Sequence, residues 1–173
     1  MELHDVVEVP RVPTKAWRQQ ATEGVVRLAL ALQAQGRDLL LAGDPVAAGE
    51  LIAAPSADQL DSVAVCLLDV NQETQLARLS ARGDDPASFV HHVAFADWMR
   101  GHAADPVHRL EVLQTAGWEQ MRWERCSAVA DRDGWSIDVL DTSGLDPDAV
   151  AAGLLAWCRR ALSGQAPAMR VRS

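Results

Sequence analysis

Two arginines lie close together in this sequence and could bind a negatively charged group. Arg78 and Arg82 are four residues apart, so they lie on one face of a helix. Guanidinium groups placed in this way can bind a small phosphorylated ligand. A solvated basic face paired with Glu73 or Asp84 is the alternative that the same spacing allows.

A nucleotide-binding lysine is missing from the sequence. The only lysine is Lys15, and it stands in Pro-Thr-Lys-Ala-Trp. A phosphate-binding P-loop needs a glycine-rich turn that ends in Gly-Lys-Ser/Thr, because backbone N–H groups and the lysine hold the phosphates together. Without that segment we expect very weak ATP affinity and negligible turnover.

Histidines and cysteines do not form a metal-binding pattern. Zinc sites on helices use histidines at i and i+4, and neither this spacing nor Cys-x-x-Cys occurs. The sequence therefore predicts no zinc site and reduced, buried thiols. The residues concerned are His91, His92, His102, His108, Cys66, Cys126 and Cys158.

Helical and strand-like segments alternate along the chain. The order predicts a doubly wound parallel α/β sheet in three layers, with helices on both faces. The predicted domain covers residues 1–162, with a lid-like helical region at about 83–125 and a disordered tail at 163–173. Predicted helices are 14–35, 72–82, 88–102, 106–116 and 146–162; predicted strands are 4–9, 38–42, 63–70 and 135–140.

The order of these segments resembles the P-loop small-molecule kinases, a group that includes shikimate, gluconate and adenylate kinases and bacterial AAA-family ATPases. The residues that carry the resemblance are 4–10, 39–44, 68–70 with Arg78 and Arg82, and 138–144. The resemblance implies ATP and Mg²⁺ as cofactors and a small-molecule phosphoryl acceptor as substrate. It also implies that the chain is N-terminally truncated, since the first strand and the P-loop have no counterpart here.

By the same resemblance, two acidic residues at the ends of strands take catalytic roles. Asp5 would orient the acceptor, and Asp44 would help to hold Mg²⁺. Each residue also has an ordinary explanation: Asp5 is a solvated carboxylate near the chain end, and Asp44 belongs to a Gly-Asp-Pro turn.

The remaining implied site residues lie on one helix and one loop. Arg78 and Arg82 would clamp the transferring phosphoryl group, whose negative charge they would stabilise. Asp141, Thr142 and Ser143 would pack against the adenine, mainly through backbone groups. Helix capping explains Thr142 and Ser143 equally well.

Composition limits the partners and the compartment. The chain has 173 residues, a formal net charge of −8 and 49% hydrophobic residues. This charge argues against a nucleic-acid partner. No apolar run approaches the ~20 residues that span a bilayer, and no signal peptide is evident, so the sequence predicts a cytoplasmic protein.

Two hypotheses other than catalysis follow from the missing P-loop. The chain could be a non-catalytic binding or regulatory module that pairs an exposed sheet strand with a partner or in an oligomer. It could also be a structural oligomer subunit. If Met1 is an internal start, the intact protein is an ATP-dependent kinase-like enzyme.

Overall fold

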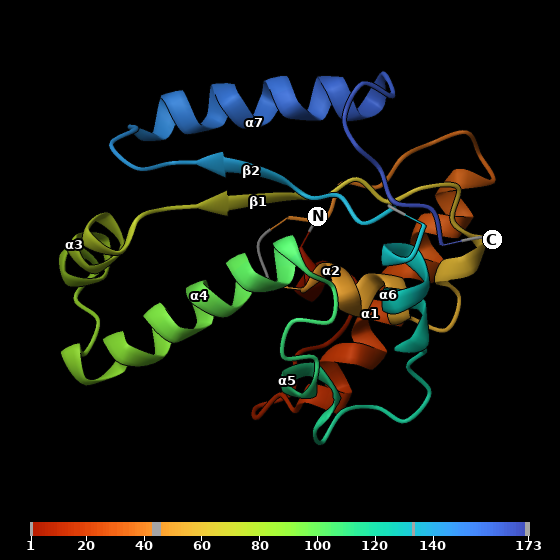
Figure 1. The fold of residues 1–173 in the computed structure, drawn as a ribbon, viewed down its shortest axis with the longest axis horizontal. Helices are drawn as coiled ribbons and strands as arrows, with labels where there is room; N and C mark the ends of the chain where they lie inside the picture. Colours follow the sequence, from red (N-terminus) through yellow and green to blue (C-terminus); the bar gives the residue numbers. More distant parts are fainter. Residues whose placement is uncertain (1, 43–45, 133, 172–173) are drawn as a thin grey trace. The chain divides into compact units, whose positions relative to one another are not determined.

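The computed structural model describes residues 2–42, 46–132 and 134–171. The chain folds into two units, each built from stretches that are far apart in the sequence (Figure 1). Unit 1 comprises Met1–Val63, Asp105–Trp135 and Met169–Ser173, and unit 2 comprises Ala64–Ala104 and Ser136–Ala168.

The regular elements of unit 1 in its described residues are helices, apart from an isolated antiparallel bridge. Its longest helix, α1, begins at Lys15 because the Thr14 hydroxyl accepts a hydrogen bond from Trp17 N at 3.1 Å. The inward face of α1 buries Ala21, Val25 and Val26. The elements are η1 (Leu3–Asp5), α1 (Lys15–Gln33), α2 (Ala48–Ala53), η2 (Ala57–Gln59), α5 (Glu111–Gln114) and α6 (Glu124–Ala130).

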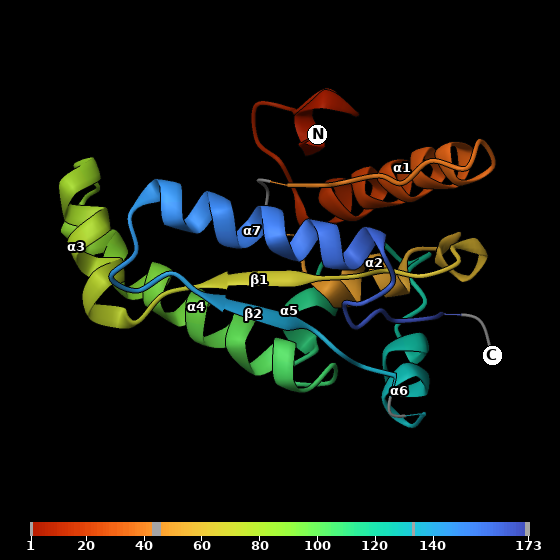
Figure 2. The same ribbon diagram turned by 90° about the horizontal axis from the view of Figure 1, so that it is seen from above.

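Unit 2 contains a pair of parallel strands with helices on both sides. Strands β1 (Cys66–Asp69) and β2 (Asp138–Asp141) pair in register, Cys66 with Asp138 and Asp69 with Asp141. Figures 1 and 2 place α7 and α4 on opposite sides of this strand pair. The helical elements of unit 2 are α3 (Gln72–Arg82), η3 (Pro86–Ser88), α4 (Phe89–Ala104) and α7 (Pro147–Leu162).

Local capping chemistry sets the ends of α3 and α7, as the sequence predicted. Asn71 accepts a hydrogen bond from Thr74 N at 2.8 Å, and Gly83 ends α3 with a φ of 85°. Asp146 caps α7 by accepting from Ala149 N at 2.8 Å, and Pro147 occupies the first turn. Both helix predictions are confirmed.

The prediction of a doubly wound, three-layer parallel sheet is wrong. The structure is mostly helical (53%), and its described residues hold one two-stranded sheet and seven α-helices. Segments 4–9 and 38–42 are not strands; they pack apolar side chains against α1 instead of pairing. A short apolar run fits either arrangement, so the pattern alone could not separate them. The packed residues are Val6, Val7, Leu39 and Leu41 against Ala21 and Val25.

Two further segments differ from what we predicted from the sequence. Residues 106–116, for which we predicted a helix, form turns with only α5 helical, and Arg109 and Ala116 have φ values of 45° and 57°. In segment 163–171, for which we predicted disorder, Met169 is fully buried and forms an antiparallel bridge with Val63.

Candidate functional site

The carboxyl ends of β1 and β2 form the most connected polar region of unit 2. Thr142 follows β2 and is 4% exposed. Its N–H and its hydroxyl both donate to Asp69 O, at 2.8 and 2.9 Å. In parallel sheets this end is where ligands bind, so we take it as the starting point for the site.

Arg78 of α3 reaches the loop that follows β2. Its Nη1 donates to Thr142 Oγ1 at 3.0 Å, and its Nη2 donates to Thr142 O at 2.8 Å. The guanidinium group is therefore bound to the protein's own oxygen atoms, and it fixes the loop to α3.

Arg100 of α4 is bound in a similar way at the end of β1. Its Nη1 donates to Asp69 Oδ1 at 2.8 Å, and its Nη2 donates to Asp97. Hydrogen bonds to the carboxylates of Asp97 and Asp69 raise the pKa of Arg100. The result is a carboxylate–guanidinium–carboxylate bridge between α4 and β1.

The loop residues assigned to the adenine by resemblance bond to their neighbours. Ser143 N donates to Asp141 Oδ1 at 2.8 Å, and hydrogen bonds from Ser143 lower the pKa of Asp141. Ser143 Oγ accepts from Asn71 N at 2.8 Å. These contacts join the loop after β2 to the start of α3, and whether the loop meets a nucleotide stays a prediction.

Arg78 and Arg82 have separate partners within the protein. Arg82 Nε donates to Asp84 Oδ1 at 2.8 Å, and this pairing raises the pKa of Arg82 and lowers that of Asp84. Arg82 therefore follows the alternative that the sequence left open, in which it pairs with Asp84. The four-residue spacing could not reveal that the two side chains have separate partners.

Asp5 and Asp44 are the two acidic residues that the resemblance singled out. Asp5 lies in η1 of unit 1, is exposed, and accepts a hydrogen bond from Glu2 N at 2.8 Å. It does not end a strand, because residues 4–9 form none. Asp44 lies outside the described residues. Within the described ranges, no group of three or more His, Cys, Asp or Glu side chains could hold a metal ion.

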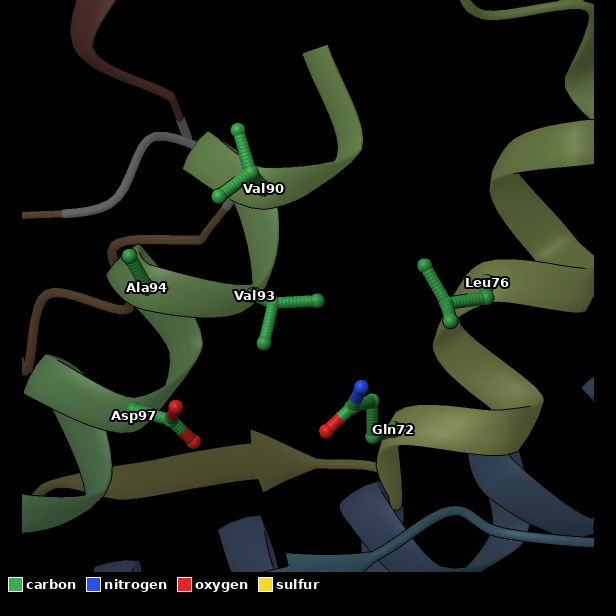
Figure 3. Close-up of a pocket in the computed structure, with 6 residues that line it drawn as sticks. All are labelled: Gln72, Leu76, Val90, Val93, Ala94 and Asp97. Atoms are coloured by element: carbon green, nitrogen blue, oxygen red, sulfur yellow. The ribbon is translucent and has the colours of Figure 1, made fainter. Parts of the chain in front are cut away.

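A shallow groove of about 420 Å³ lies between α3 and α4 (Figure 3). Its α4 wall repeats at i, i+3, i+4 and i+7, so one helical face lines it. The sequence contained this spacing, but only the placement of α3 beside α4 makes it a groove. The lining residues are Gln72 and Leu76 of α3 and Val90, Val93, Ala94 and Asp97 of α4.

Apolar side chains are exposed on both faces of the strand pair. Alternate residues of a strand point to opposite faces. Leu68 shares a face with Leu140, which contacts α7 at Gly153, yet Leu68 is 47% exposed. Val139 lies on the opposite face and is 56% exposed. The helices thus leave one apolar side chain of each strand open to solvent.

Comparison with protein-family models, curated proteins and solved structures finds no match. Among the described helices, none has the length and apolar character that a membrane crossing requires. The fold and the site define unit 2 as a small parallel strand pair between helices, with one exposed apolar side chain on each face.

Proposed function

We propose that this chain is a non-catalytic binding module, in which the β1–β2 sheet of unit 2 binds an extended segment of another protein. The observation that carries the proposal is the open strand pair, in which Leu68 and Val139 are exposed on opposite faces. Parallel sheets are almost always covered on both faces and have more than two strands. A strand from a partner would add a third strand to the two that the described residues form.

Backbone geometry supports strand addition. Val65 O and Asp69 O accept hydrogen bonds from Asp138 N and Thr142 N, so these odd-numbered positions of β1 face β2. Hydrogen-bonding direction alternates along a strand, so the peptide groups of Val139 point away from β1. Such an edge is a template for pairing with an added strand.

The edge of β2 is the proposed binding edge, because Val139 is the more exposed of the two side chains. A strand placed there would cover Val139 if it carried an apolar side chain on the same face. The expected partner is therefore an extended segment of alternating apolar, β-branched residues.

A peptide titration tests strand addition. The probe is a synthetic peptide with the sequence of residues 63–70 and serine in place of Cys66, which carries the large apolar residues Val63, Val65 and Leu67 at alternate positions. We expect it to shift the NMR amide signals of 138–141 and to protect them from hydrogen exchange. Val139→Lys should abolish both effects.

Leu155→Lys is the matched control, because Leu155 is 51% exposed but belongs to α7. Binding that survives Val139→Lys, or that Leu155→Lys weakens equally, would contradict the proposal. Sedimentation of the free protein distinguishes a second copy from a foreign partner, since self-pairing gives a dimer that Val139→Lys dissociates.

We propose a non-catalytic role because two arginines of unit 2 are already hydrogen-bonded within the protein. Arg78 and Arg100 are held by loop and carboxylate oxygens, so neither is free to clamp a transferring phosphoryl group. Calorimetric titration with Mg-ATP should give no binding heat. A binding heat that Arg78→Ala removes would favour an ATP-dependent phosphotransferase instead.

A further inference from the structure

Two cysteines of unit 2 lie at the contact between β1 and α7. Cys66 of β1 is the register partner of Asp138, so both side chains point to the same face of the sheet. Asp138 Oδ2 accepts a hydrogen bond from Trp157 Nε1 of α7 at 2.9 Å. Cys66 therefore faces α7.

Cys158 follows Trp157 in the sequence and lies on the sheet-facing side of α7. The less exposed residues of α7 repeat at i, i+3, i+4, i+7, i+8 and i+11, which is one face of a helix. They are Val150, Gly153, Leu154, Trp157, Cys158 and Ala161.

The helix approaches the sheet closely along this face. A Cβ atom on Gly153 would lie only 3.3 Å from Leu140 Cδ2. Both cysteines are free and partly exposed. Burial raises the pKa of the Cys66 thiol, and electrostatic interactions with Asp138 and Cys158 act in the same direction.

We infer that Cys66 and Cys158 form a dithiol site that a small-molecule disulfide oxidises to an intramolecular disulfide joining β1 to α7. One thiolate attacks a sulfur atom of oxidised glutathione and releases one glutathione thiolate, which leaves a mixed disulfide. The second protein thiolate then attacks the protein sulfur and releases the second glutathione. Two protein thiols are oxidised, one glutathione disulfide is reduced to two thiols, and the two protons pass to the glutathione thiolates.

The bond would fasten α7 to the sheet. It would close a long loop between two elements that are distant in the sequence, and such a closure restricts the unfolded chain. The melting temperature of the oxidised protein should rise, and reduction with dithiothreitol should restore the original value.

Mass spectrometry tests the pairing. The folded protein is treated with oxidised glutathione, alkylated and digested with trypsin, which places Cys66 in peptide 38–78, Cys158 in peptide 133–159 and Cys126 in peptide 126–132. We expect a cross-link between 38–78 and 133–159 that dithiothreitol removes.

Single variants make the result specific. Cys126→Ser should leave the cross-link unchanged, whereas Cys66→Ser and Cys158→Ser should each stop at a mixed disulfide with glutathione on the remaining thiol. Circular dichroism checks that each variant is folded. Cys158→Ala replaces Cys158→Ser if the serine variant does not fold. Glutathione on both peptides without a cross-link, or cross-linking to 126–132 in the folded protein, would overturn the inference.

Discussion

The two units differ in how many side chains they bury and in how many large apolar side chains they expose. Unit 1 contains most of the buried residues described, and four of them are polar: Gln19, Thr22, Glu23 and Glu50. Unit 2 contains most of the large apolar side chains that are exposed. These are Leu68, Val90, Phe95, Val139, Leu145, Leu155 and Leu162. On the proposal made above, unit 1 would serve as the scaffold and the exposed apolar side chains of unit 2 would form the binding surface.

Buried polar side chains connect the segments of unit 1. Gln19 Nε2 donates to Leu113 O at 2.9 Å, and Gln19 Oε1 accepts from Trp118 N at 2.6 Å. Glu50, fully buried, accepts from Arg18 Nη2 at 2.7 Å and from Gln19 Nε2 at 3.3 Å. Such networks stabilise one arrangement only when every member has a partner.

The largest effect is expected from Glu50→Ala in unit 1. The substitution leaves the Arg18 guanidinium and the Gln19 amide without their shared acceptor. Removing one member of a buried ion pair costs about 3–5 kcal/mol, and the partial exposure of Arg18 favours the lower end of that range. Urea denaturation monitored by circular dichroism measures the change.

Glu111→Ala is the control for this experiment, because Glu111 pairs with Arg109 on the surface and both side chains are well exposed. Its free energy of unfolding should stay within about 0.5 kcal/mol of the original. Equal losses in the two variants would show that the polar network of unit 1 has no special role.

A second substitution in unit 1 tests how tightly it is packed. A Cβ atom on Gly117 would lie 2.7 Å from Gln19 Oε1 and 3.0 Å from the carbonyl oxygens of Leu113 and Gln114. Gly117→Ala must displace backbone as well as the network, so we expect a loss of about 1–3 kcal/mol. Thermal unfolding of the variant gives the value, and an unchanged melting temperature would contradict the tight packing.

Local chemistry explains which elements the sequence could predict. The cap residues Asn71 and Gly83 lie next to the helix that they end, so α3 was predicted at its observed bounds. The partner of Arg78 is Thr142, 64 residues away, and no local pattern indicates it. The same holds for segments 4–9 and 38–42, whose apolar residues pack on α1 and not in a sheet.

In unit 2, Arg78 and Arg82 give a matched pair of substitutions. Arg78→Ala removes the donor to Thr142 Oγ1 and leaves Thr142 O with only the longer hydrogen bond from Leu145 N at 3.3 Å. We expect a loss of about 1–2 kcal/mol because Thr142 is buried. Arg82→Ala removes a pair with Asp84 in which the Arg82 side chain is 65% exposed, and it should leave the unfolding midpoint nearly unchanged. Chemical denaturation of both variants decides whether the arginines act separately, and equal losses would argue that they act together.

The loss of unfolding free energy at acid pH should depend on Glu23 of unit 1. Burial alone would raise the pKa of Glu23, but hydrogen bonds from Ser56 Oγ, Ser56 N and Arg27 lower it below its usual value. A carboxyl whose pKa is lower in the folded state stabilises the protein above its unfolded-state pKa of about 4.3. That contribution is lost as the pH falls through the folded-state pKa.

Glu23→Gln should therefore flatten the fall in unfolding free energy below about pH 4.3, while Asp61→Asn, on an exposed residue, should not. Denaturation midpoints measured from neutral pH into the acid range check the slope. A slope that is the same in the Glu23→Gln variant would assign the acid sensitivity to other carboxyls.

The smallest effect is expected from Gly153→Ala in α7, where two terms oppose each other. Alanine stabilises a helix interior by about 1 kcal/mol relative to glycine. Against this, the new methyl group would lie 3.3 and 3.4 Å from Leu140 Cδ2 and Cδ1, so Leu140 must move slightly. Leu140 belongs to a strand pair whose neighbours Leu68 and Val139 are exposed, so it has room to adjust and the net change should be under about 1 kcal/mol. A loss as large as that of Gly117→Ala would mean that unit 2 is packed as tightly as unit 1, and the contrast between scaffold and recognition surface would not hold.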